Sequence, residues 1–216
     1  MLAKVKFCGM TRPEDAAVAA EIGAAYVGVI FAAGPRKVSM DQAREILAAA
    51  GPGLRHVGVF DTNDPDRVAD LAEDSGVQIV QLHADPLPSD IEAIRQSFAG
   101  EVWAAIRLPG SRIPHEADLL FETADGVVLD AHAETRLGGT GIPLPWNELA
   151  VDLARDRGGA AVVLAGGLNP RNVGYAIRTL APDVVDVASG VESSPGIKDP
   201  WLMREFYNAA LGHTVH

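Results

Sequence analysis

Two side chains able to move protons each follow a short apolar segment of this 216-residue chain. Cys8, the only cysteine, comes directly after residues 4–7, and Asp130 comes directly after residues 127–129. If both segments are parallel strands, their carboxyl ends meet on one rim, where α/β proteins bind ligands. A thiolate can act as a base and a carboxylic acid as an acid. The pair is therefore a candidate for acid–base catalysis.

Less specific roles also fit these two residues. A free cysteine often serves as a small, buried apolar side chain, and an aspartate in a loop often caps a turn. Both alternatives stay open from the residues alone, and the shared position at strand ends favours the catalytic role.

Two glycine-containing segments predict a phosphate site. Gly166 and Gly167 follow residues 161–165, and Ser189 and Gly190 follow residues 184–187. Glycine lets backbone N–H groups approach an anion closely. In many eight-stranded barrels, the loops after strands seven and eight bind phosphate.

Three further polar residues are candidates for contacts with a ligand. Arg36 lies in the loop after residues 26–30 and could hold a carboxylate through two parallel hydrogen bonds. His83 follows residues 79–82, and Asp186 lies within residues 184–187; a hydrogen-bonded structural role is the simpler interpretation of each. No cysteine–histidine spacing typical of zinc and no dinucleotide fingerprint occurs, so neither a metal site nor a cofactor is expected.

The order of the elements predicts a single-domain parallel (β/α)8 TIM barrel over residues 1–216. Eight apolar segments are each followed by a helical pattern or a loop long enough to hold one. An open doubly wound sheet is the alternative, but it usually has fewer strands. The strand candidates are residues 4–7, 26–30, 56–60, 79–82, 102–106, 127–129, 161–165 and 184–187.

Two local patterns give further predictions. Thr11 and Glu14 have the spacing of a capping box at the start of a helix over residues 12–23. The glycine-rich segment 131–145 is expected to be a lid over the ligand, because it follows a strand candidate on the rim.

Composition narrows the classes of partner. The chain has 18 basic and 29 acidic residues, a net charge of −11, and this makes nucleic acid an unfavourable partner. No apolar run is long enough to span a membrane. A single cysteine excludes an intrachain disulfide and fits a cytoplasmic protein, which could be a homo-oligomer.

Seven short segments, in a fixed order along the chain, carry a family resemblance. They are residues 6–11, 35–36, 80–83, 129–131, 138–141, 164–170 and 186–192. With these segments the sequence resembles the phosphoribosylanthranilate isomerase family of tryptophan biosynthesis. Gly34, Ala84 and Ala188 depart from the residues usual in that family.

The resemblance implies a cofactor-free Amadori rearrangement of N-(5-phosphoribosyl)anthranilate, giving 1-(2-carboxyphenylamino)-1-deoxyribulose 5-phosphate. Cys8 matches the family's general base, and Asp130 matches its general acid. Arg36 would hold the anthranilate carboxylate. The phosphate would lie at Gly166, Gly167, Ser189 and Gly190.

Two other functions stay open. The sister isomerase of histidine biosynthesis performs the same rearrangement on a two-phosphate substrate. It has an aspartate at the position of Cys8 and phosphate motifs in both halves, whereas residues 61–63 hold no glycine pair. A non-catalytic phosphosugar-binding barrel would need no acid–base pair.

Overall fold

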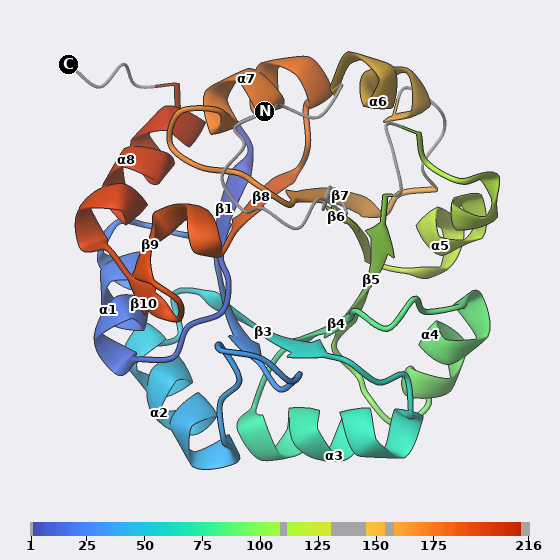
Figure 1. Cartoon of the computed structure of the whole chain (residues 1–216). Coiled ribbons are helices and arrows are strands. Elements are labelled where there is room, and N and C mark those ends of the chain that lie inside the picture. Colours follow the sequence, from blue (N-terminus) through green and yellow to red (C-terminus); the bar gives the residue numbers. More distant parts are fainter. Residues whose placement is uncertain (1, 109–111, 131–145, 154–157, 213–216) are drawn as a thin grey trace.

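The computed structural model, which describes residues 2–108, 112–130, 146–153 and 158–212, contains a closed barrel of eight parallel strands in chain order (Figure 1). The predicted TIM barrel is thereby confirmed. The strands are β1 (Lys4–Phe7), β2 (Tyr26–Ile30), β3 (Arg55–Phe60), β4 (Ile79–Leu82), β5 (Glu101–Arg107), β6 (Gly126–Asp130), β7 (Ala161–Ala165) and β8 (Val184–Val187).

Helices surround the strands as an outer ring (Figure 1). They are α1 (Pro13–Glu21), α2 (Met40–Ala50), α3 (Pro65–Ser75), α4 (Pro88–Ile94), α5 (Asp118–Thr123), α6 (Trp146–Leu153), α7 (Val173–Leu180) and α8 (Pro200–Ala210). The 3-10 helix η1 (His115–Ala117) precedes α5, in the unit where prolines and glycine weaken the helical pattern. Most strand residues are buried on both faces, as parallel strands under a ring of helices must be.

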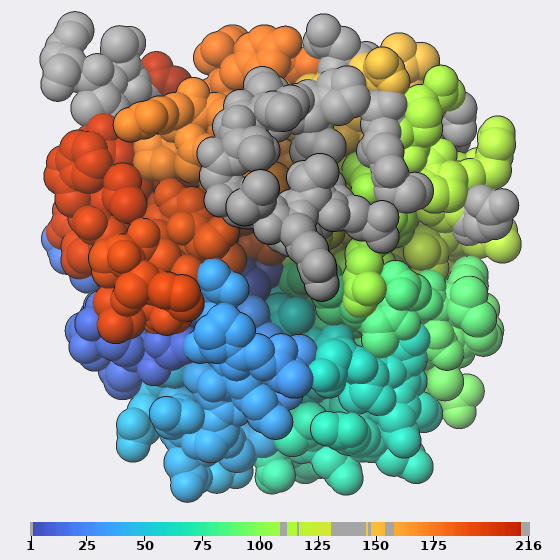
Figure 2. Space-filling view, viewed as in Figure 1, coloured from blue at the N-terminus to red at the C-terminus, as the bar shows by residue number. Residues whose placement is uncertain are grey.

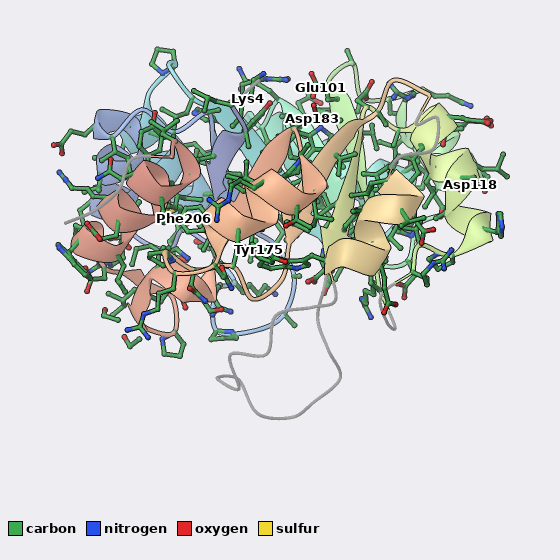
Figure 3. The ribbon with its side chains drawn as sticks, turned by 90° about the horizontal axis from the view of Figure 1, so that it is seen from above. Lys4, Glu101, Asp118, Tyr175, Asp183 and Phe206 are labelled. Carbon is green, nitrogen blue, oxygen red and sulfur yellow. The ribbon has the colours of Figure 1, made fainter. Side chains whose placement is uncertain are left out.

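Inside the barrel, apolar side chains fill the end at which the strands begin. Tyr26 and Trp103 pack edge to face there, with ring centroids 5.2 Å apart. Figure 3 places Lys4, Glu101 and Asp183, which stand at or just before the start of β1, β5 and β8, along one edge of the molecule. The carboxyl ends of the strands therefore lie at the opposite edge of the molecule, on the other side of these apolar side chains.

The segment after β8 contains structure that the sequence patterns did not predict. The 3-10 helix η2 (Ser189–Val191) leads into an antiparallel hairpin of β9 (Glu192–Ser194) and β10 (Ile197–Lys198). The Pro195-Gly196 pair is the turn signal that could have revealed it.

The predicted capping box at Thr11 is wrong. Helix α1 begins at Pro13, with Arg12 at its N-cap and no side-chain capping bond. Thr11 instead donates its hydroxyl to the carbonyl of Gly196 in the hairpin, which the fold places beside it although 185 positions separate the two residues. The predicted lid, residues 131–145, lies outside the described residues.

No helix in the described ranges is both long enough and apolar enough to span a membrane.

Candidate active site

The two proton-moving candidates lie on the same rim of the barrel. Asp130 is the last residue of β6, and Cys8 directly follows β1. The Cys8 N–H donates to the carbonyl of Val187 at the end of β8, at 2.9 Å. Figure 2 shows this face of the molecule, where the blue segment after β2 meets the red segment after β8 beside a central hollow. The structure therefore places both residues on the same rim of the barrel.

The Cys8 side chain is buried and packs against the backbone of β2. A methyl group built on Gly28 would lie 2.9 Å from Cys8 Sγ and 3.4 Å from Lys6 Cε, so the missing side chain at Gly28 makes room for both. Burial raises the pKa of the Cys8 thiol; Lys6 and Lys198 oppose this shift, and Asp186 adds to it. The two lysines are thus the groups that favour the thiolate.

A buried polar layer lies beneath Cys8. Lys6, whose side chain is fully buried, donates to Asp186 Oδ2 at 2.8 Å and to Gln81 Oε1 at 2.9 Å. Burial by itself would lower the pKa of Lys6, but the charges of Asp186 and Cys8 outweigh it and the pKa is raised. Asp186 Oδ1 is also buried and has no hydrogen-bond partner among the described residues.

Lys6 and Gln81 were missed as site residues. A sequence signal for them exists: Lys6 is a charged residue and Gln81 an amide residue within short strands whose other central residues are apolar, and polar residues at such buried positions need a partner.

His83 is the partner of Asp130. His83 Nε2 lies 3.4 Å from Asp130 Oδ2, and both side chains are partly exposed. Arg107 of β5 donates to the His83 carbonyl at 2.9 Å, which fixes the backbone there. The buried Nδ1 of His83 has no partner among the described residues. His83 is therefore placed to orient the proposed acid.

Arg36 pairs with a carboxylate of the protein, a contact that the sequence did not predict. Its guanidinium forms a bidentate pair with Glu192 of β9, with Nε–Oε1 at 2.8 Å and Nη2–Oε2 at 2.7 Å. Lys198 of β10 donates to the same carboxylate at 2.8 Å. Burial would raise the pKa of Glu192, but the hydrogen bonds from the two cations outweigh it and the pKa is lowered.

The two predicted phosphate loops lie in contact. A methyl group on Gly190 would come within 1.9 Å of the Leu168 carbonyl oxygen, so the loops after β7 and β8 meet backbone to backbone. Gly166 and Gly167 have φ angles of +86° and +66°, which favour glycine. Asn172 donates to the Gly167 carbonyl at 2.9 Å. Gly167 and Ser189 are exposed on the rim.

Together these residues place a thiol, a carboxyl group, two cations around one carboxylate, and two glycine loops on one rim. In the part of the chain that the structure describes, no group of three or more histidine, cysteine or acidic residues is arranged to hold a metal ion. The arrangement fits proton transfer within a small phosphorylated molecule.

Comparison with known proteins identifies this combination. The family model described as N-(5'-phosphoribosyl)anthranilate isomerase matches residues 5–209. The isomerase of that name from Rubrobacter xylanophilus is 43% identical over 211 residues, which cover 97% of this chain and 99% of that protein. The one from Pseudomonas aeruginosa is 38% identical over 208 residues, with 95% and 94% covered.

Solved structures of similar proteins point to the same family. Phosphoribosyl anthranilate isomerase from Thermotoga maritima superposes with a TM-score of 0.87 at 34% identity, over 97% of this chain and 99% of that one. Another solved isomerase, in complex with reduced 1-(o-carboxyphenylamino)-1-deoxyribulose 5-phosphate, gives a TM-score of 0.84 at 32% identity, with 97% and 99% covered. The chain therefore belongs to the N-(5'-phosphoribosyl)anthranilate isomerase family.

Proposed function

We propose that Cys8 and Asp130 carry out the family's reaction, the isomerisation of N-(5'-phosphoribosyl)anthranilate, as base and acid. The observation that carries this assignment is the position of Cys8: its thiol is buried beside the ammonium of Lys6, on the rim that also holds Asp130. Its thiolate form, which Lys6 and Lys198 favour, can take a proton from a ligand bound at the mouth of the barrel.

In the first step, protonated Asp130 gives its proton to the ribose ring oxygen. The C1′–O bond breaks as the nitrogen lone pair forms a C=N bond, which leaves a cationic Schiff base. In the second step, the Cys8 thiolate takes the proton from C2′, and the C–H electrons form the C1′=C2′ bond of an enolamine. The cationic nitrogen is the electron acceptor in this step. Tautomerisation of the enolamine then gives the ketone.

The remaining candidates hold the substrate. Arg36 pairs with the anthranilate carboxylate. The phosphate accepts hydrogen bonds at Gly166, Gly167, Ser189 and Gly190. Asp186 Oδ1, which is buried without a partner among the described residues, accepts from a sugar hydroxyl, and His83 keeps Asp130 oriented.

The assembly and the cellular location are part of the proposal. One solved relative, at 32% identity, is described as generated monomers of the dimeric phosphoribosylanthranilate isomerase from Thermotoga maritima. We infer that this chain can also form a homo-oligomer. A base that is a lone thiol needs a reducing environment, which favours the cytoplasm.

The test is loss of substrate fluorescence on adding the purified protein to N-(5'-phosphoribosyl)anthranilate. Cys8→Ala and Asp130→Asn should each lower kcat by roughly 10²-fold or more, the lower range for a positioned acid or base. Asp118→Asn, which changes an exposed carboxylate on α5, is the matched control and should keep wild-type kcat. A folded Cys8→Ala variant with near-normal turnover would refute Cys8 as the base. A wild-type protein that binds the substrate without consuming it would favour a non-catalytic phosphosugar-binding barrel.

A further inference from the structure

Arg36, which is proposed to bind the substrate carboxylate, already forms an ion pair with a carboxylate of the protein. Arg36 Nε and Nη2 both donate to Glu192, whose side chain is only 4% exposed. A guanidinium that is neutralised in this way would attract an anionic ligand weakly. The groups around Arg36 must therefore explain how it can still bind a second carboxylate.

Part of the answer is the geometry of the guanidinium group. It has five N–H donors and two edges that can each hold a carboxylate. In the hydrogen bonds between described residues, Arg36 uses only Nε and Nη2, its side-on edge. The end-on edge, formed by Nη1 and the second N–H of Nη2, stays available, and the side chain is 25% exposed.

The aliphatic part of Arg36 is packed against neighbouring backbone. A methyl group built on Gly9 would lie 2.6 Å from Arg36 Cδ, so the side chain lies directly against the residue after Cys8. The hairpin is in contact as well, since a methyl group on Gly196 would lie 3.2 Å from the Pro35 carbonyl. With its stem against Gly9 and its side-on edge on Glu192, Arg36 has one defined orientation.

The charge of the cluster is set by Lys198. Its side chain is fully buried and donates to Glu192 Oε1 at 2.8 Å and to the Ala188 carbonyl at 3.0 Å. Burial lowers the pKa of Lys198, and the hydrogen bond and charge of Glu192 oppose this. One carboxylate thus lies between two basic side chains, Arg36 and Lys198.

We propose that Glu192 and Lys198 are positioning residues for recognition of the aryl carboxylate of the substrate. Glu192 fixes Arg36 so that its end-on edge faces the ligand, and Lys198 restores the positive charge that Glu192 would otherwise cancel. Neither residue needs to touch the substrate. The inference rests on the proposed function, in which Arg36 binds the anthranilate carboxylate.

Two variants separate position from charge. Glu192→Asp keeps the charge of the cluster but shortens the side chain, which breaks the bidentate pair with Arg36. Lys198→Gln keeps a hydrogen-bond donor for Glu192 but removes the positive charge. Each variant is assayed with N-(5'-phosphoribosyl)anthranilate as substrate and with N-(5'-phosphoribosyl)aniline, which lacks the carboxylate, as competing ligand.

Both variants should raise KM for the anthranilate substrate roughly tenfold, as expected when one charge-assisted contact is weakened. The kcat of Glu192→Asp should stay near the wild-type value, whereas that of Lys198→Gln should also fall, because Lys198 favours the Cys8 thiolate. The affinity of both variants for the aniline compound should not change. The matched controls are Glu21→Asp and Lys4→Gln, at an exposed ion pair and an exposed strand start, and they should leave both ligands unaffected.

Equal weakening of both ligands, or an unchanged KM for the anthranilate substrate, would overturn the inference. If Lys198→Gln does not fold, as judged by circular dichroism, Glu192→Asp alone decides the positioning role and Lys198→Met decides the charge role. A wild-type protein that does not consume the anthranilate substrate would instead refute the proposed function. The two failures are therefore distinguishable.

Discussion

The ammonium of Lys6 and the carboxylate of Asp186 lie 2.8 Å apart inside the barrel, although 180 positions separate them in the chain. Lys6 lies on β1, two residues before Cys8, which directly follows that strand, so the two side chains point to the same side. Removing either partner of a buried ion pair leaves an uncompensated charge, which is strongly destabilising. The proposed base, Cys8, thus lies next to a buried cation, Lys6, whose position is fixed by hydrogen bonds to Asp186 and Gln81.

The first prediction concerns the pH dependence of catalysis. Because burial raises the pKa of Cys8, the thiolate fraction and kcat/KM should both rise with pH through the neutral and alkaline range. Lys6→Met removes a cation that favours the thiolate, so this rise should move to higher pH. At neutral pH the rate should fall roughly tenfold, the effect of about 1.4 kcal/mol.

Ultraviolet thiolate absorbance can follow Cys8 alone, because it is the only cysteine. The charged groups that act on this thiol are Lys6, Asp186, Lys198 and Arg36. Lys4→Met, which changes the exposed lysine at the start of the same strand, is the control and should not move the profile. A Lys6→Met profile identical to that of the wild type would show that Lys6 has no electrostatic role.

The second prediction concerns Gly28. A methyl group there would lie 2.9 Å from Cys8 Sγ and 3.3 Å from the Cys8 backbone, so Gly28→Ala should displace the base. We expect kcat to fall by roughly 10²-fold, since small misplacements of reacting groups are costly, while KM changes little. Gly53→Ala, where a methyl group meets open space, is the control for a change from glycine to alanine. Normal turnover in a folded Gly28→Ala variant would contradict the placement of Cys8.

The third prediction concerns the phosphate loops. Gly190→Ala would force a methyl group to within 1.9 Å of the Leu168 carbonyl oxygen, and neither backbone can give way without separating the loops. KM should rise by roughly tenfold or more, the loss of one or two charge-assisted hydrogen bonds, and competitive inhibition by inorganic phosphate should be lost. Gly167→Ala is a milder comparison, because its methyl group meets open space and only the φ of +66° is strained. Retained phosphate inhibition in Gly190→Ala would place the anion elsewhere.

The fourth prediction concerns Arg36. Arg36→Ala should raise KM and lower kcat/KM for the anthranilate substrate by roughly tenfold or more, because a charge-assisted pair contributes about 1.5–3 kcal/mol. In steady-state assays of the double variant with Lys198→Gln, the second change should add little to the rise in KM, since Lys198 affects carboxylate binding through Arg36. Fully additive effects on KM would mean that the two residues act independently.

The sequence by itself determined the barrel and the rim on which its chemistry lies. Runs such as Tyr26–Ile30 are apolar throughout because both faces of a parallel strand are buried, and eight such runs separated by helical patterns leave few other folds. Since parallel strands all end on one rim, Cys8, Asp130 and the glycine loops could be assigned to the same rim without knowing any contact between them.

Only the tertiary structure decided which partners these residues have. Gln81 reaches Lys6 across 75 positions and Glu192 reaches Arg36 across 156, and both distances close only when the barrel and its hairpin form. Thr11 shows the same limit. Its local pattern predicted a helix cap, but its hydroxyl donates instead to a carbonyl 185 positions away. Local sequence patterns report on backbone conformation and burial, whereas a long-range hydrogen bond depends on strand order and register, which no short segment contains.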